Sequence, residues 1–285
     1  MADWNRIDYS NLIVGEGPLW DEKNRILYTI DIRGKCIRAM KWDTGEIIQY
    51  EYPQEIGCIA LTKERDILAA MTDGIYIAKP DGSLMPICVP KELKGRRFND
   101  GKVGPDGRFY VGTTDYQHQG AFYQLDPDGT FVELFDQVGC SNGLAWSTDY
   151  RTLYYCDSPT KILEAFDFDP MNGTLSNRRE VMPIPCEIGE FDGMTIDNLD
   201  RLWVAVWGSH KVLCIDPVRK EVVEEIQFPV SKVSCCGFAG EDLNTLVVTS
   251  AAFQTDLQKE PAAGNTFALE LPVAGFPTYR FGERK

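Results

Sequence analysis

Short apolar segments alternate with polar turns along the whole chain. A recurring unit contains an apolar segment, a turn rich in Asp, Asn or Gly, a second apolar segment, another turn and a third segment. The segments are rich in Val, Ile, Tyr, Trp and Phe, and turn sequences such as PDG, LDR and TDG separate them. This pattern predicts β-strands, and almost no helical periodicity accompanies it.

The unit occurs six times. Three copies are clear, at residues 17–50, 142–181 and 192–228, and weaker copies begin near Ile59, Asp100 and Cys236. Repeats of about 40–50 residues built from four short strands are typical of propeller blades, whereas solenoid repeats of this length normally carry helices. Five of the six starts carry a glycine, namely Gly17, Gly101, Gly143, Gly193 and Gly237.

We therefore expect an all-β protein in which residues 1–285 form a single six-bladed β-propeller with four-stranded blades. The segment Trp4–Tyr9 precedes the first unit, and we expect it to complete the last blade, because ring closure removes an exposed sheet edge. Trp207 and Phe253 fall near predicted strand ends, and we expect both to fill blade cores.

Composition narrows the class of protein. The chain has 43 acidic and 29 basic residues and a net charge of −14, which argues against a nucleic-acid partner. The N-terminal segment lacks the pattern of a secretory signal, and no apolar run approaches the roughly 18 residues that cross a bilayer. These features predict a cytoplasmic protein with no membrane partner.

Cysteine and histidine give little support to a zinc site. The nine cysteines form no C-x-x-C pair, and the only histidines are His118 and His210. We interpret the cysteines as small buried residues in a reducing compartment and His210 as part of an exposed turn. His118 lies in a polar loop, and a contact between His118 and the substrate remains an alternative. Dinucleotide, P-loop, zinc-protease and serine-hydrolase motifs are all missing from the sequence.

The residues at the six blade starts are candidates for chemistry, because the first strand of a blade lies nearest the propeller axis. Buried polar groups there need partners, since desolvation without one costs about 1–3 kcal/mol. In chain order the starts carry Glu16, Cys58, Asn99–Asp100, Asn142, Asp192 and Ser234–Cys235.

One divalent cation would satisfy Glu16, Asn142 and Asp192 together. Two carboxylates and an amide give ligation by oxygen alone, which favours Ca²⁺, with Zn²⁺, Mn²⁺ and Mg²⁺ as alternatives. Three protein ligands leave positions open for water or substrate. The competing interpretation is that Asn142-Gly143 and Asp192-Gly193 are ordinary turn pairs, but their recurrence at equivalent places favours ligands.

Several motifs in order resemble the senescence-marker protein/gluconolactonase/luciferin-regenerating family. They are GEGPLWD at 15–21, RRFNDGKVGPDGRFYVGT at 96–113, SNGLAWS at 141–147, SNRRE at 176–180 and DGMTID at 192–197. The similarity runs from about Gly15 to about Thr249. It implies a six-bladed propeller with one divalent metal at the channel mouth.

The resemblance also implies roles for individual residues. Glu16, Asn142 and Asp192 match the family's metal ligands, and Asp192 also matches its catalytic base. Arg97 and Asn99 match residues that contact the substrate. The chain departs from the family in the short loop TTDYQHQG, so that Asp115, Tyr116 or Gln117 takes the place of a substrate-facing glutamate.

Together these observations predict a metal-dependent hydrolase that converts a sugar (aldono-) lactone to the aldonic acid, with the metal as Lewis acid and Asp192 as general base. Two alternatives remain. One is a metal-dependent organophosphate triesterase, and the other is a non-catalytic propeller that binds calcium or docks proteins. We expect a monomer or a weak homodimer whose partner is a small sugar lactone.

Overall fold

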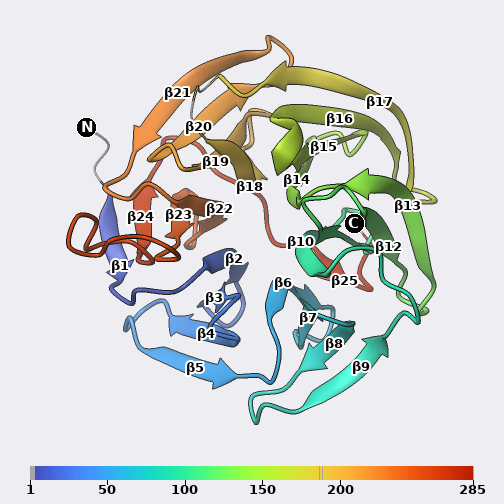
Figure 1. The fold of residues 1–285 in the computed structure, drawn as a ribbon, viewed down its shortest axis with the longest axis horizontal. Helices are drawn as coiled ribbons and strands as arrows, with labels where there is room; N and C mark the ends of the chain where they lie inside the picture. The colour runs from blue at the N-terminus through green and yellow to red at the C-terminus, as the bar shows by residue number, and fades with distance from the viewer. Residues whose placement is uncertain (1–3, 186, 188, 285) are drawn as a thin grey trace. The chain divides into compact units, whose positions relative to one another are not determined.

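The computed structural model describes residues 4–185, 187 and 189–284. It is built almost wholly of strands, which form the six blades of a β-propeller (Figure 1). Five blades contain four consecutive antiparallel strands, and the sixth combines three consecutive strands with β1. The predicted fold class is confirmed. Within the described residues the one helical element is the single 3₁₀ turn η1 (Ser158–Thr160).

Two compact units each contain three blades. Residues 1–49 and 184–278 form the first unit. Its first two blades contain β2 (Gly15–Asp21), β3 (Ile26–Asp31), β4 (Cys36–Lys41) and β5 (Ile47–Glu51), then β18 (Glu190–Ile196), β19 (Leu202–Trp207), β20 (Lys211–Asp216) and β21 (Glu221–Gln227). Its third blade contains β22 (Val233–Ala239), β23 (Thr245–Ser250), β24 (Thr266–Glu270) and β1 (Asn5–Asp8).

Residues 50–183 and 279–285 form the second unit. Its first two blades contain β6 (Ile56–Thr62), β7 (Ile67–Met71), β8 (Ile75–Ala78) and β9 (Leu84–Cys88), then β10 (Arg97–Val103), β11 (Phe109–Thr114), β12 (Gly120–Leu125) and β13 (Phe131–Val138). Its third blade contains β14 (Ser141–Trp146), β15 (Thr152–Asp157), β16 (Ile162–Asp169) and β17 (Thr174–Pro183).

Both chain termini add strands to blades. β1 pairs antiparallel with β24, with Asn5 opposite Ala268, which confirms that the N-terminal segment completes the last blade (Figure 1). The C-terminal strand β25 (Arg280–Phe281) pairs in parallel with β6, so this blade has a fifth strand that the sequence pattern did not predict.

The first three strands of the blades form the core, and their outermost strands are solvated. All seven residues of β6 are buried, whereas β21 is mostly exposed, with Val222 partly buried and Ile226 buried. In the second unit an aromatic cluster that includes Tyr110, Phe122 and Trp146 fills the space between blades. Strands that are covered on both faces read as near-continuous apolar runs, as the second strands β7 and β19 do.

Each first strand contains a β-bulge close to its beginning. In β2 the register shifts between Glu16 and Leu19, and in β18 it shifts between Phe191 and Met194. The other four first strands, β6, β10, β14 and β22, shift at the matching place. Bulges re-aim side chains and are common beside active sites. The bulges therefore set the direction of the polar residues at the blade starts.

Glycines allow neighbouring first strands of one unit to approach closely. A Cβ atom on Gly57 of β6 would lie 2.3 Å from the carbonyl oxygen of Phe98 in β10. In the first unit, a Cβ atom on Gly193 of β18 would lie 2.2 Å from the Sγ atom of Cys235 in β22. Any larger residue at these positions must push two strands apart.

We predict that Gly57→Ala lowers the free energy of unfolding by about 3 kcal/mol, because the methyl group meets backbone that cannot move alone. Urea denaturation measures this change. Gly129→Ala is the control: its Cβ atom would meet nothing within 4 Å, and only its positive φ of 89° opposes the substitution. That strain is about 1 kcal/mol. Equal losses in the two variants would contradict close strand approach as the reason for Gly57.

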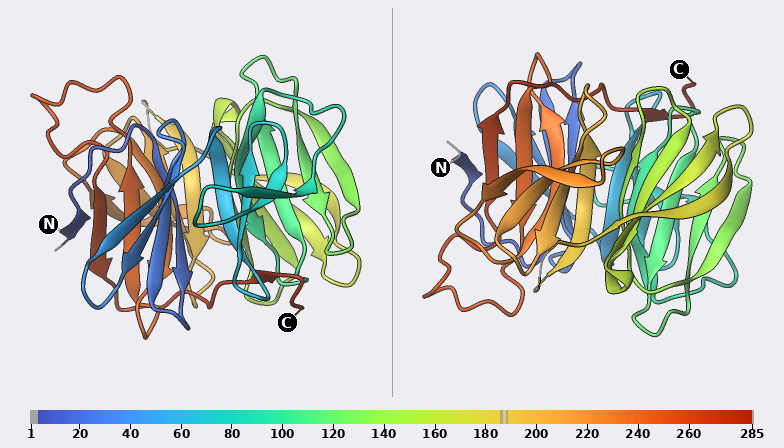
Figure 2. Two further views of the ribbon diagram at one scale, coloured as in Figure 1. Left: turned by 90° about the horizontal axis from the view of Figure 1, so that it is seen from below. Right: turned by 90° about the horizontal axis from the view of Figure 1, so that it is seen from above.

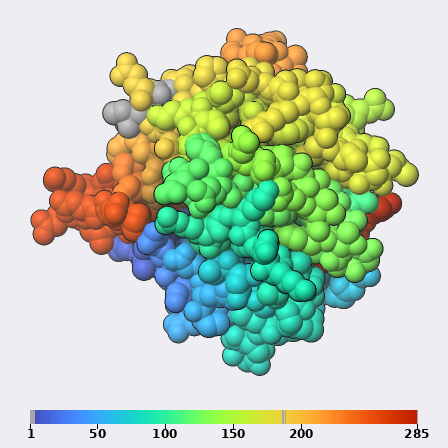
Figure 3. Space-filling view, turned by 45° about the vertical axis from the view of Figure 1, so that its right-hand side comes forward, coloured from blue at the N-terminus to red at the C-terminus, as the bar shows by residue number. Residues whose placement is uncertain are grey.

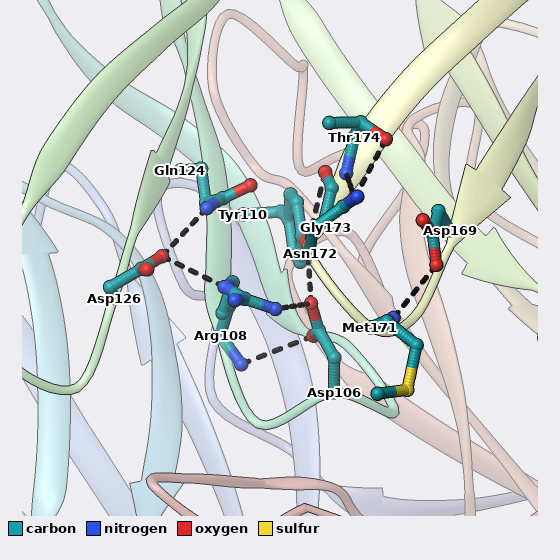
Figure 4. A network of polar contacts seen from close by, with 10 residues as sticks. All are labelled: Asp106, Arg108, Tyr110, Gln124, Asp126, Asp169, Met171, Asn172, Gly173 and Thr174. Carbon is teal, nitrogen blue, oxygen red and sulfur yellow. Dashed lines mark hydrogen bonds and ion pairs between the residues drawn. The ribbon is translucent and has the colours of Figure 1, made fainter.

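The second unit contains a buried polar network around Arg108 (Figure 4). Arg108 forms ion pairs with Asp106 at 2.8 Å and Asp126 at 3.0 Å, and the hydroxyl of Tyr110 donates to Asp106 at 2.7 Å. Burial raises the pKa of Tyr110 above its ordinary value. A Cβ atom on Gly173 would lie 2.6 Å from the Tyr110 hydroxyl. The network therefore ties the β16–β17 turn to the β10–β11 turn and has a structural role.

Candidate active site

The second unit joins three predicted site residues in one chain of hydrogen bonds. Nη1 of Arg97 donates to Oδ1 of Asn99 at 2.7 Å, and Nδ2 of Asn99 donates to Oδ1 of Asn142 at 3.0 Å. Nδ2 of Asn99 also donates to the carbonyl oxygen of Ser141 at 2.7 Å. Residues from β10 and β14 are thus held together.

The two ends of this chain are also fixed. Nε of Arg97 lies 3.1 Å from Oε2 of Glu55, in the segment before β6. Nδ2 of Asn142 donates to Oγ of Ser158 at 2.7 Å, which leaves Oδ1 as the oxygen directed toward Asn99. An amide oxygen has two lone pairs, so Asn142 retains one for a further ligand.

In the first unit, Glu16 and Asp192 occupy matching places at the bulges of β2 and β18. Each residue is more than nine-tenths buried, with exposed fractions of 8% for Glu16 and 7% for Asp192. Oε2 of Glu16 accepts the N–H of Gly17 at 2.8 Å. Neither Asn142-Gly143 nor Asp192-Gly193 forms a hairpin turn, because both pairs lie inside strands. The turn interpretation is wrong.

The donor chemistry of the predicted ligands fits a hard divalent cation. Buried carboxylates need a compensating charge or hydrogen bonds, and carboxylate and amide oxygens are the ligands that Ca²⁺ prefers. In the described part of the chain, no group of three or more His, Cys, Asp or Glu side chains forms a metal-binding cluster. The predicted set contains only two residues of those types, Glu16 and Asp192, and its third ligand is the amide of Asn142.

Asp100 is a polar residue of the site region that the sequence prediction did not include among the site residues. It lies in the bulge of β10, directly after Asn99, and its Oδ1 accepts the N–H of Gly101 at 2.8 Å. Its Oδ2 is buried without a hydrogen-bond partner, and burial raises the pKa of this carboxyl. The signal was present in the sequence, because Asp100-Gly101 matches Glu16-Gly17, Asn142-Gly143 and Asp192-Gly193.

The loop between β11 and β12 carries the three predicted substitutes for a glutamate. The N–H of Asp115 donates to the carbonyl oxygen of Gly139 at 2.7 Å, so the loop is anchored beside the start of β14. Oδ1 of Asp115 accepts the N–H of Gln117 at 2.9 Å and is used within the turn. The side chains of Tyr116 and Gln117 are exposed, and Tyr116 is 64% exposed. His118 follows them and lies 4.0 Å from Asp157.

Trp207 and Phe253 do not fill blade cores, so that prediction is wrong. Both are partly exposed, and each ring lies under a cation: Lys232 over Trp207 at 5.9 Å and Arg33 over Phe253 at 4.3 Å. Phe253 belongs to the long segment 251–265 between β23 and β24, which projects from its blade and is orange-red in Figures 2 and 3. Lys232 donates to Phe253 and Gln254 carbonyl oxygens, which secures this segment.

Three further predictions from the sequence concern His210, the cysteines and membrane-spanning segments. His210 lies in an exposed turn with a positive φ of 63°, as expected. Seven of the described cysteines are buried and Cys88 is partly buried, while Cys186 lies outside the described residues. Across residues 4–284, with 186 and 188 left aside, no helix is long and apolar enough to cross a membrane.

These features define a class of protein. It is a six-bladed β-propeller in which four of the six first strands carry a buried carboxylate or amide near their beginning, namely Glu16, Asn99, Asn142 and Asp192. Residues 14–252 match the model of the family described as SMP-30/Gluconolactonase/LRE-like region. The chain belongs to this family.

Three relatives show the extent of the similarity. The chain is 36% identical over 277 residues to "Putative sugar lactone lactonase YvrE" of Bacillus subtilis, covering 94% of this chain and 95% of the relative. It is 37% identical over 278 residues to regucalcin of Danio rerio, covering 94% of each. A solved luciferin-regenerating enzyme superposes with a TM-score of 0.90 at 26% identity, covering 98% of this chain and 99% of that one. Family membership confirms the prediction of a lactone-hydrolysing enzyme.

Proposed function

We propose that the chain hydrolyses a sugar (aldono-) lactone to the corresponding aldonic acid and requires a divalent metal ion. The observation that carries the proposal is the hydrogen-bonded series Arg97–Asn99–Asn142. It places a guanidinium and an amide, both suited to polyhydroxylated substrates, beside a residue with the chemistry of a metal ligand. The name of the Bacillus subtilis relative, a sugar lactone lactonase, agrees with this substrate class.

Glu16, Asn142 and Asp192 would hold the ion, with Ca²⁺ favoured by ligation through oxygen alone. When bound, the ion supplies Lewis-acid polarisation of the lactone carbonyl. The residues contribute two negative charges and one neutral amide. Glu16 and Asp192 are buried in the first unit, so a bound cation would also offset the desolvation of these two carboxylates.

Asp192 would act as the general base. Its carboxylate takes a proton from a water molecule as the water oxygen forms a bond to the carbonyl carbon. The bond between that carbon and the ring oxygen then breaks, and the ring oxygen receives a proton to become a hydroxyl group. One water is consumed and one hydroxy acid is formed. General-base catalysis of this kind contributes about 10²–10⁴-fold in rate.

Arg97 and Asn99 would orient the sugar. Arg97 is partly exposed and is held by Glu55, so its guanidinium has few alternative conformations, and donors that remain can bind substrate hydroxyls. Asn99 is buried and is fixed through Asn142. Tyr116 and Gln117 have the exposed side chains in the β11–β12 loop, so these two, rather than Asp115, are best suited to take the place of the family's substrate-facing glutamate.

Hydrolysis of a panel of aldonolactones by the full chain, loaded with Ca²⁺, Zn²⁺ or Mn²⁺, tests the proposal. We expect acid release, followed with a pH indicator and corrected for spontaneous hydrolysis, from at least one of the glucono-, xylono-, arabinono- and galactonolactones. A lactone without hydroxyl groups should have a kcat/KM at least about 10²-fold lower, because donors positioned for hydroxyls lose their partners.

An aryl dialkyl phosphate in the same assay separates the alternatives. Hydrolysis of the phosphate triester with no hydrolysis of any lactone would replace the proposal with the triesterase function. Failure of folded, metal-loaded protein to hydrolyse either class would replace it with a binding function.

A further inference from the structure

Asp31, at the end of β3, binds the segment that leads into β2. Its Oδ2 accepts the N–H of Ile13 at 2.7 Å, and its Oδ1 accepts the N–H of Val14 at 3.0 Å. The next residue, Ile32, donates its N–H to the carbonyl oxygen of Val14 at 2.9 Å. Three hydrogen bonds therefore fix the two residues that immediately precede Gly15 and Glu16.

Asp157, at the end of β15 in the other unit, makes the same contacts. Its carboxylate accepts the N–H of Gly139 at 3.0 Å and that of Cys140 at 2.7 Å. The N–H of Ser158 donates to the carbonyl oxygen of Cys140 at 3.0 Å. These bonds fix the two residues that precede Ser141 and Asn142. The arrangement is therefore repeated in full in two separate blades.

The strand registers match as well. Asp31 is opposite Gly15 across β2 and β3, and Asp157 is opposite Ser141 across β14 and β15. Both aspartates are almost wholly buried, with exposed fractions of 5% and 2%. In the other four blades the residue opposite the first residue of the first strand is not a carboxylate: these residues are Met71, Thr114, Trp207 and Ser250.

We propose that Asp31 and Asp157 are positioning residues, which clamp the beginnings of β2 and β14 and so fix the direction of Glu16 and Asn142. This proposal rests on the proposed function, in which Glu16 and Asn142 bind the metal ion. Only two of the six blades have the clamp, and these are the blades that carry Glu16 and Asn142. Asp192, the third proposed ligand, starts a blade without this carboxylate.

The physical reason for a clamp is the bulge that follows. A β-bulge interrupts the ladder just after the ligand residue, so ladder hydrogen bonds hold the ligand from one side only. A buried carboxylate that accepts two N–H groups supplies charge-assisted hydrogen bonds on the other side. Gly34 is part of the arrangement: it donates its N–H to Asp31 at 2.8 Å, and a Cβ atom there would lie 2.5 Å from the carboxylate.

Asp31→Asn and Asp157→Asn in the full chain test the clamp. Each amide keeps the size of the carboxylate but loses the charge and one acceptor oxygen. We expect the backbone N–H groups at 13–14 or 139–140 to exchange with deuterium at least about 10-fold faster. We also expect the dissociation constant for Ca²⁺, measured by titration calorimetry on chelator-treated protein, to rise about 10-fold. Gly34→Ala, which displaces the Asp31 carboxylate without changing charge, should reproduce the effects of Asp31→Asn.

Asp21→Asn is the matched control. Asp21 lies at the opposite end of β2, is fully buried, and accepts the N–H groups of Lys23 and Asn24, each at 3.2 Å. This variant should leave both the exchange at 13–14 and the Ca²⁺ affinity unchanged. Equal effects in Asp21→Asn, or unchanged exchange or affinity in the clamp variants, would overturn the proposal. If the clamp variants exchange faster but wild-type protein neither binds Ca²⁺ nor hydrolyses lactones, the proposed function fails and the clamp remains as a strand anchor only.

Discussion

Replacing Asp192 with Asn is expected to lower kcat for lactone hydrolysis by at least about 10³-fold. The loss of a general base contributes about 10²–10⁴-fold, and the loss of one of two ligand carboxylates adds to it. Asp192 is 7% exposed and lies in the bulge of β18, between the buried residues Phe191 and Gly193. Initial rates with the best lactone of the panel measure the change.

Three controls make the Asp192 result specific. Asp216→Asn, in the same unit, removes a carboxylate that accepts the N–H groups of Val218 and Arg219 in the turn after β20, and it should keep wild-type activity. Thermal unfolding must show that Asp192→Asn is folded. Asp192→Glu keeps a carboxylate but moves it by one methylene, and we expect an intermediate rate. Turnover by folded Asp192→Asn within tenfold of wild type would contradict the role of Asp192 as base.

The sequence was sufficient for the fold because the fold is repetitive. Glycines at the blade starts recur because bulges and close strand approach require them, as Gly17 with a φ of 58° and Gly193 against Cys235 illustrate. The same repetition predicted that Trp4–Tyr9 would join the last blade, since a blade short of one strand has an unpaired edge. The strand β25 has no counterpart in the other blades, so no repeat pattern could indicate it.

From the sequence, only those site residues could be predicted that are recognisable by their residue type and place in the repeat. Asn99 and Asn142 could be selected because polar residues at the starts of apolar strands are conspicuous, whereas Arg97 was selected through the family resemblance. Asp31 and Asp157 are aspartates before turns, which is an ordinary place for an aspartate, and their contacts to the preceding strand depend on register. Trp207 and Phe253 look like core residues from hydrophobicity alone, and only the structure shows the cations of Lys232 and Arg33 over their rings.

Removing divalent metal with a chelator is expected to reduce lactone hydrolysis by at least about 10²-fold, and adding Ca²⁺, Zn²⁺ or Mn²⁺ should restore it in an order that identifies the best ion. The physical reason is that Glu16 and Asp192 are buried carboxylates of the first unit, and a bound cation would offset part of their desolvation. The same reasoning predicts that the ion stabilises the fold, by about 2.7 kcal/mol at a concentration 100 times its dissociation constant.

The stability measurement separates binding from catalysis in the metal experiment. Thermal unfolding of chelated protein should shift to higher temperature as the ion is added, and the midpoint concentration should agree with that for recovery of activity. Glu16→Gln removes one ligand charge, so it should need at least about tenfold more ion for both effects, because its amide binds hard cations more weakly than a carboxylate does. Asp216→Asn should titrate like wild type. Full activity in protein shown by elemental analysis to be free of divalent metal would contradict metal dependence, whereas stabilisation without activity would indicate a binding protein.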